Sequence, residues 1–339
     1  MRPAFRPAPF SIGLMATLLS SAALAEVPRV ATDIAPIHSL VAQVMGDLGE
    51  PALIVQPGAS PHGYAMRPSE ARALNEADLV VWVGEALTPW LEGPIASLAE
   101  DANQIELMAV EGTILHDYRE GATFGDHDHA EDDHDHDHGH DHAKDGDHDH
   151  DHAGKADEAA HDHEGHDHAG ADSHVWLDPV NARLWLSVIA AELSRLDPEN
   201  AATYAANATE GQADIDALQA DIAASLAPLS DKGFVVFHDA YQYFERRFDL
   251  GAAGSITFSD ASAPSAGRIA ELREAVATMG AGCVFAEPQF DKRLIDTVFD
   301  GTAQVGLLDP LGQDLAPGPD LYPQMMRAMA ASFVTCLDG

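Results

Sequence analysis

Short apolar runs alternate with amphipathic segments along most of this chain. The runs in RVATDIAP, PALIVQP and DLVVWVG have the length of buried strands, and segments with apolar residues at helical spacing follow them. The alternation returns after residue 230, in KGFVVFHDA, a strand near 254–258, GCVFAEP and QVGLLDPLG. Strands that alternate with helices predict an α/β fold with mostly parallel sheets.

An alanine-rich segment, residues 198–229, separates these two groups of elements. Its apolar residues recur at helical spacing, at Ile215, Leu218, Ile222 and Leu226. We therefore predict two α/β lobes, residues 26–197 and 230–339, joined by one long rigid helix over 198–229. One continuous sheet with an incidental helix is the alternative. A helical joint also predicts that the lobes move by small rotations.

The first 25 residues have the layout of a cleavable secretory signal. Arg2 and Arg6 precede the apolar run FSIGLMATLLSSAALA, which ends in small residues before Glu26. No later window approaches the roughly 20 apolar residues that span a bilayer. We expect export to the periplasm and a mature chain that begins near Glu26; an N-terminal membrane anchor is the alternative.

A histidine- and acid-rich insert interrupts the first lobe over residues 126–172. It holds 18 acidic residues against Lys144 and Lys155, so about −16 of the formal net charge of −38 lies there. Such a segment has too few apolar residues to offset its ordering entropy, and we predict a disordered loop. The acidic balance repels phosphate backbones and suits cations, which argues against a nucleic-acid partner.

Two cysteines, Cys283 and Cys336, are the only ones in the chain. After export to an oxidising compartment, one disulfide between them is the natural expectation. Two separately buried thiols are the alternative, because sequence alone does not show that the two Cα atoms approach each other.

Five histidines lie outside the insert, at positions 38, 62, 116, 174 and 238, and three of them occupy places where α/β proteins build sites. His238 follows FVVF at the predicted carboxyl end of a strand, and His62 lies in the loop after ALIV. His174 stands at the end of the insert, before VWLDP. A single such histidine is usually structural, but three imidazoles from both lobes suit zinc, completed by a carboxylate or water.

Several long stretches occur in order along the chain: PGASPHGYAMRPSEARALNEADLVVWVGEAL, HVWLDP, VVFHDAYQYFERRF, CVFAEPQF and LLDPLG. They resemble the signature sequences of periplasmic zinc-binding proteins of ABC importers, the high-affinity zinc uptake type called ZnuA. The resemblance runs from about Arg29 to Cys336, and the insert matches a variable acidic loop of that family. It implies two α/β lobes bridged by a rigid helix, Zn²⁺ bound between them, and delivery to a membrane permease.

The resemblance places the zinc ligands on His62, His174 and His238, the histidines selected above by position. Asp309 in LLDPLG matches a position where relatives place a carboxylate ligand. A water molecule in that position is the alternative, with Asp309 then a turn or helix-capping residue before Pro310.

For other residues near the expected cleft, the sequence leaves more than one role possible. Some relatives have an acidic ligand where this chain has Pro61. Glu287 ends a predicted strand and is expected to orient a ligand histidine through its ring N–H, or to accept a structural hydrogen bond. We expect His38 to be an auxiliary ligand, a neighbour of the ligands or a surface residue, and His116 to lie on the surface.

The insert's 14 histidines alternate with aspartates, so many flexible ligand combinations exist. Flexible ligands lose entropy on binding, and each such site should be weaker than a preorganised one. We therefore expect one tight Zn²⁺ site at the fixed histidines and additional weak sites on the insert that concentrate zinc near the cleft. A solvated acidic loop without a role in metal binding is the alternative.

These features together predict a monomeric periplasmic solute-binding protein, not an enzyme, that passes Zn²⁺ to an ABC permease. A periplasmic metallochaperone that loads it is a further candidate partner. A zinc storage or buffering protein that acts through the insert is one alternative function. A secreted zinc hydrolase is another, although the chain contains neither HExxH nor GxSxG. Copper or nickel could also bind imidazoles in vitro.

Overall fold

The computed structural model describes residues 27–119, 123–124, 170–257, 282–288 and 304–338, with isolated helical positions at 267, 269–271 and 273–274. The predicted signal peptide, residues 126–169 of the insert and most of residues 258–281 lie outside the described residues.

Four parallel strands form the sheet of the first lobe, in the order β2-β1-β3-β4. They are β1 (Val30–Thr32), β2 (Ala52–Leu53), β3 (Leu79–Trp82) and β4 (Asn103–Glu106). Alternate residues of a strand point to opposite faces of the sheet. Accordingly, Leu79 and Val81 join the core under α1 (Ala35–Met45), whereas Val80 and Trp82 pack with α2 (Pro68–Asn75) and α3 (Glu92–Leu98).

The second lobe contains a separate parallel sheet, in the order β6-β5-β7-β8. Its strands are β5 (Phe234–His238), β6 (Ala252–Thr257), β7 (Cys283–Ala286) and β8 (Gln304–Leu307), and its helices include α6 (Gln242–Arg247) and α9 (Leu321–Leu337). Two sheets confirm the two-lobe α/β fold and exclude the single continuous sheet. A Cys283–Cys336 disulfide joins β7 to α9, with the Cα atoms 5.9 Å apart, which confirms the predicted pairing and excludes two free thiols.

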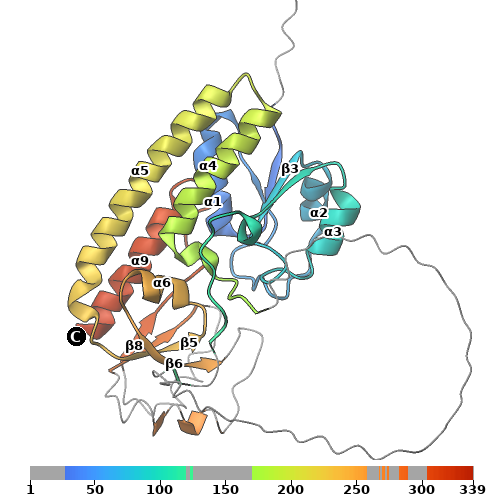
Figure 1. The fold of residues 1–339 in the computed structure, drawn as a ribbon. Helices are drawn as coiled ribbons and strands as arrows, with labels where there is room; N and C mark the ends of the chain where they lie inside the picture. The colour runs from blue at the N-terminus through green and yellow to red at the C-terminus, as the bar shows by residue number, and fades with distance from the viewer. Residues whose placement is uncertain are drawn as a thin grey trace, which may run out of the picture.

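A long helix, α5 (Ala201–Leu226), connects the lobes and confirms the predicted bridge. It extends along one whole side of the molecule, beside α4 (Pro179–Leu196), and also packs against α1 and α9 (Figure 1). Gly211 permits close approach to α1, because a Cβ atom there would lie 2.7 Å from the Gln43 amide. One continuous cluster of buried apolar side chains runs from α1 through α5 to α9. The joint between the lobes is therefore packed along its length.

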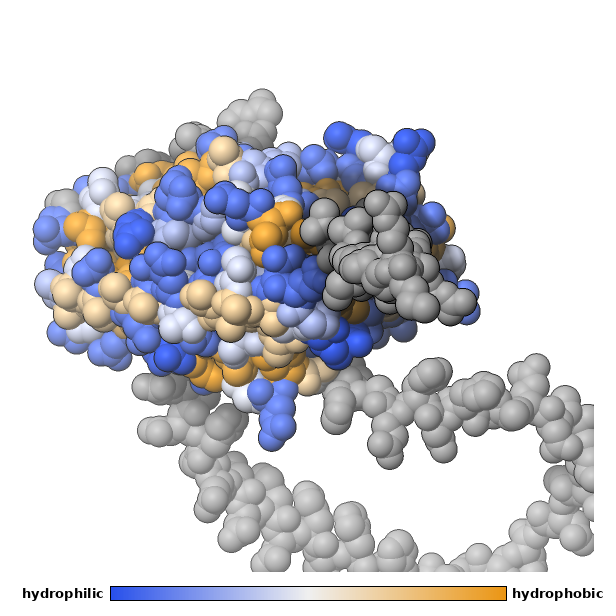
Figure 2. Space-filling view, turned by 90° about the horizontal axis from the view of Figure 1, so that it is seen from above, coloured by the Kyte–Doolittle hydropathy of each residue, from blue (hydrophilic) through white to orange (hydrophobic). Residues whose placement is uncertain are grey.

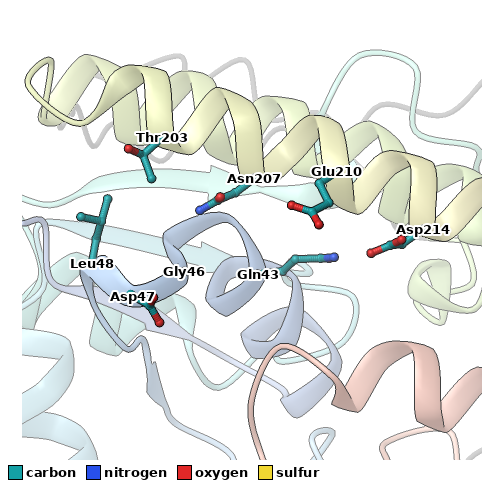
Figure 3. Close-up of a pocket in the computed structure, with 8 residues that line it drawn as sticks. All are labelled: Gln43, Gly46, Asp47, Leu48, Thr203, Asn207, Glu210 and Asp214. Carbon is teal, nitrogen blue, oxygen red and sulfur yellow. The ribbon is translucent and has the colours of Figure 1, made fainter.

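On the face that Figure 2 shows, hydrophilic residues predominate and apolar residues lie among them. None of the described helices is both long and apolar enough to span a membrane. Between α1 and α5 lies a hollow of about 390 Å³, in which Glu210 and Asp214 face Gln43 from across the groove (Figure 3). Carboxylates and amides make up most of the lining of this hollow, and no imidazole is among its lining residues.

Candidate metal centre

The last residue of β5, His238, is one of the predicted ligands. The central position of β5 in its sheet buries this side chain, which is only 3% exposed. Its Nδ1 atom contacts the carboxylate of Glu287, which follows the neighbouring strand β7 and is equally buried. Parallel strands bring their carboxyl ends to one edge of the sheet, which explains why the two residues meet.

The second predicted ligand, His174, lies just before a 3₁₀ turn over Val175–Leu177 and is also buried. Its Nδ1 atom is 2.7 Å from Oδ1 of Asp172, and the same oxygen accepts the backbone N–H of His174. The other oxygen, Oδ2, accepts a hydrogen bond from Gln242 at 3.3 Å. Asp172 therefore fixes both the backbone and the ring of His174.

The two imidazoles face each other through their second nitrogens. The Nε2 atoms of His174 and His238 are 3.4 Å apart, and the ring centroids are 5.3 Å apart. Carboxylates accept the Nδ1 hydrogen of both rings, so the hydrogen-bond network assigns the tautomer with its lone pair on Nε2. Two lone pairs that point at each other suit a shared cation, and imidazole nitrogen is a preferred ligand of zinc.

The third predicted ligand, His62, lies in the loop after β2 and is half-buried. Its ring centroid is 5.7 Å from that of His174, so all three predicted histidines converge in one region. Trp90 holds this loop, because its indole N–H donates to the carbonyl of Pro61 at 2.7 Å. This contact fixes the backbone directly before His62 while the imidazole itself stays partly exposed.

Asp309, the predicted fourth ligand, follows β8 at the same edge of the second sheet. Its carboxylate accepts backbone N–H bonds from residues 311, 312 and 313, at 3.1, 2.9 and 2.6 Å. Burial raises the pKa of this group, and the three bonds oppose the rise. The geometry is that of a turn-forming aspartate, the alternative role given above, and it leaves the fourth ligand open.

Tyr241 packs beside the pair of carboxylates that follow β7 and β8. Its ring centroid is 6.2 Å from that of His238, and its hydroxyl is fully buried. Burial, followed by the nearby charges of Glu287 and Asp309, raises the pKa of Tyr241 well above its usual value. Its hydroxyl has no hydrogen bond of good geometry among the described residues. The site thus has a buried phenol beside its carboxylates.

The remaining two histidines outside the insert do not join this group. His38 is buried in α1, and its Nε2 atom lies 3.0 Å from the carbonyl oxygen of Pro51. Burial lowers the pKa of His38. His116, which we expected on the surface, is half-buried because its ring packs against Tyr243 with centroids 4.8 Å apart. Burial also lowers the pKa of His116.

The imidazoles converge without forming a complete coordination sphere. Across the described part of the chain, no group of three or more His, Cys, Asp and Glu side chains is arranged to hold a metal ion. His174 and His238 are fixed by buried carboxylates, whereas His62 is on a partly exposed loop. The His62 ring nevertheless lies beside that of His174, so it belongs to the same cluster of imidazoles.

Comparison with known proteins identifies the family of this chain. The sequence profile of ZnuA, described as zinc-uptake complex component A, periplasmic, matches residues 30–336. The high-affinity zinc uptake system protein ZnuA of Brucella abortus is 47% identical over 325 residues, which cover 95% of this chain and 96% of the relative. The chain belongs to the ZnuA family. ZnuA of Paracoccus denitrificans is 46% identical, over 96% of this chain and 97% of its own.

Solved structures share the ZnuA-family fold. A crystal structure of ZnuA matches with a TM-score of 0.68 at 24% identity, over 91% of this chain and 99% of that chain. The substrate-binding protein FpvC of Pseudomonas aeruginosa matches with a TM-score of 0.70 at 22% identity, over 92% of this chain and 99% of its own. The resemblance drawn from the sequence motifs is thus confirmed, and so is the architecture that it implied.

Two residues of this ZnuA-family site were missed in the sequence. Asp172 lies in a stretch where aspartates and histidines alternate, so nothing marks it as the partner of His174. The hydrogen bond of Trp90 to the His62 loop joins positions 29 residues apart, and no local pattern marks it. The short spacing of Asp172 and His174 is the one local signal, and the composition of the insert conceals it.

Proposed function

We propose that this ZnuA-family protein captures Zn²⁺ in the periplasm and passes it to an ABC permease, with His62, His174 and His238 as the nitrogen ligands. One observation carries the proposal. Two nitrogens bound to zinc at about 2.0–2.1 Å and near the tetrahedral angle lie about 3.3–3.4 Å apart. The Nε2 atoms of His174 and His238 have this separation, 3.4 Å.

Charge supports a divalent cation as the cargo. Asp172 and Glu287 are each 1% exposed and contact the outer nitrogens of the two buried imidazoles. Carboxylates in this position raise the basicity of a ligand imidazole and fix its orientation. They also place negative charge next to the ion, which offsets its charge in a buried site. Three imidazoles favour zinc over manganese, which prefers more oxygen ligands.

The fourth ligand in this proposal is Asp309 or a water molecule. Asp309 lies at the correct edge of the second sheet but would have to give up part of its backbone contacts to reach an ion. Glu287 is occupied by His238, and His38 is directed toward Pro51. A carrier has to release its cargo to a permease, and a replaceable fourth ligand suits that role.

The insert supplies additional weak zinc sites in this proposal, while the tight site belongs to the fixed histidines. One solved structure with the same fold is of a ZnuA deletion mutant with zinc bound. The protein is proposed to be exported by residues 1–25 and to act as a monomer, with the permease and a periplasmic metallochaperone as its partners. The 14 histidines of the insert favour zinc buffering as the second candidate function.

Zinc titration against a competing chelator tests the proposal and separates the two functions. The site variant replaces His62, His174 and His238 by alanine, and the control replaces three insert histidines, His127, His129 and His134. A carrier loses its tight phase in the site variant and keeps it in the control. A buffer keeps nearly all its capacity in the site variant, and that result would contradict the carrier function. A chain that lacks residues 126–169 should retain the tight phase.

A further inference from the structure

The segment before the insert leaves the first lobe and attaches to the second. The backbone N–H of His116 donates to the hydroxyl of Tyr243 on α6 at 3.0 Å. Farther along, Thr123 forms an antiparallel bridge with Gly254, and the N–H of Phe124 donates to the carbonyl of Ala253 at 3.0 Å. Residues 123–124 therefore add to the outer edge of β6, the edge strand of the second sheet.

Arg119, between these contacts, binds two buried carboxylates of the second lobe. Its terminal nitrogens donate to both oxygens of Glu245, at 2.8 and 3.0 Å. Its Nε atom donates to Asp239 at 2.9 Å, and a terminal nitrogen contacts the same carboxylate. The Phe124 ring covers the guanidinium, whose carbon lies 3.8 Å from the ring centroid. We call Arg119, Asp239 and Glu245 the clasp.

The side chains of the clasp are withdrawn from water. Arg119 is 16% exposed, and the two carboxylates are 4% and 3% exposed. Charge-assisted, two-pronged contacts in such a setting are strong and geometrically specific. Loss of the arginine leaves two buried carboxylates without their cation, which is costly. The clasp therefore differs from the exposed Arg183–Asp216 pair, where solvent screens the charges.

The clasp is connected to a proposed zinc ligand through a short two-stranded ribbon, residues 116–118 and 170–172. Asp117 and Ala171 form an antiparallel bridge, and the N–H of Asp172 donates to the carbonyl of His116 at 2.7 Å. Gln242 of α6 donates to the carbonyl of Asp117 and to the Asp172 carboxylate. The ribbon thus ends in the aspartate that fixes His174.

The geometry points to Arg119 as a positioning residue of the zinc site. It fastens the ribbon, and with it Asp172 and His174, to Asp239, the residue next to His238. The inference rests on the proposed function, since it concerns the same ion. Residues 116–119 before the insert and residues 170–172 at its end then help to position the ligands, and a deletion within the insert preserves zinc affinity only if it leaves both segments intact.

The test compares zinc affinity and zinc dissociation rate in Arg119→Met with those in two controls. Arg183→Met removes an exposed arginine by the same substitution. Leu218→Ala, in the buried face of α5, lowers stability without touching the site. We expect Arg119→Met to weaken zinc binding by about tenfold and to speed dissociation, since residues behind metal ligands contribute about 10- to 100-fold to affinity. Both controls should retain wild-type affinity.

Three results would overturn the inference. The first is an Arg119→Met protein with wild-type affinity. The second is a Leu218→Ala protein that loses as much affinity, because the effect would then follow from stability alone. If Arg119→Met does not fold, Arg119→Lys is measured in its place, since lysine keeps the charge but not the two-pronged contact. The third result that would overturn the inference is wild-type zinc affinity in Arg119→Lys. The absorption spectrum of bound Co²⁺ should also change in the Arg119 variants but not in Leu218→Ala.

Failure of the proposed function gives a different pattern. If the wild type and the His62, His174, His238 triple variant bind zinc alike, the histidines are not the tight site and the carrier proposal fails. If that triple variant loses tight binding while Arg119→Met retains it, only the positioning role of Arg119 fails.

Discussion

The contribution of the disulfide to the free energy of unfolding can be worked out from the length of the loop that it closes. Cys283 and Cys336 are 53 positions apart, and their bond closes a loop that includes all of β8 and most of α9. In the chain-entropy description, closing a loop of this length removes about 14 cal/mol/K from the unfolded state, or about 4 kcal/mol at 25 °C. Reduction should therefore lower the free energy of unfolding by about 4 kcal/mol.

Urea unfolding followed by tryptophan fluorescence measures this change. The oxidised protein, the reduced protein and a Cys283→Ala, Cys336→Ala double variant are compared without zinc, because the metal stabilises the fold by binding. The reduced protein and the double variant should lose similar amounts of stability. Zinc affinity under native conditions should stay close to that of the oxidised form, because β7 remains paired on both sides and still presents Glu287. A change below about 1 kcal/mol would refute the loop-entropy reasoning.

Four further predictions concern the zinc site, the buried carboxyl group of Asp33 and the helix α5 that joins the lobes. Asp172→Asn should weaken zinc binding by about 10- to 100-fold in calorimetry, whereas Asp214→Asn, in the acidic hollow, should not. Zinc affinity should fall on acidification, because protonated imidazole does not bind metal, and a pH-independent affinity would contradict histidine ligation. Burial raises the pKa of Asp33 to about 7, against the opposing bonds from Val83 and Ile34. The folded state therefore holds this proton more tightly than the unfolded state, so the stabilisation is fully present below pH 3.8 and is lost as the pH rises toward about 7. The free energy of unfolding of the wild type, measured relative to that of Asp33→Asn, should decline over that range. Solution scattering of apo and zinc-loaded protein should differ only slightly, because α5 is packed along α1, α4 and α9; a large separation of the lobes would contradict this packing.

The buried strands could be predicted because they are apolar over their whole length. LVVW in β3 and FVVFH in β5 are covered on both faces, so their sequences read as continuous apolar runs. The strand β4, with the sequence NQIE, was not predicted, since an edge strand needs few apolar residues. The last helix, α9, was also missed, although its buried residues recur every third or fourth position.

The three proposed ligand histidines could be selected from their places at strand ends and at the end of the insert, and Glu287 could be predicted as a partner of one of them. Which histidine it contacts, and the partners Asp172 and Arg119, could not be predicted. His238 and Glu287 meet because β5 and β7 are neighbours, and sheet order is not written in local sequence. Arg119 contacts Asp239 across 120 positions, and nothing near either residue marks the pair. Asp172 is hidden among the many aspartates of the insert. Positions along single strands were therefore predictable, whereas contacts between distant segments required the structure.

A crystal structure of the mature protein with one equivalent of Zn²⁺, located by its anomalous scattering, tests the central claim most directly. We predict one ion between the lobes, with Nε2 of His174, Nε2 of His238 and a nitrogen of His62 each about 2.0–2.1 Å from it. An ion held elsewhere, or one that any of these three imidazoles fails to reach, would contradict it.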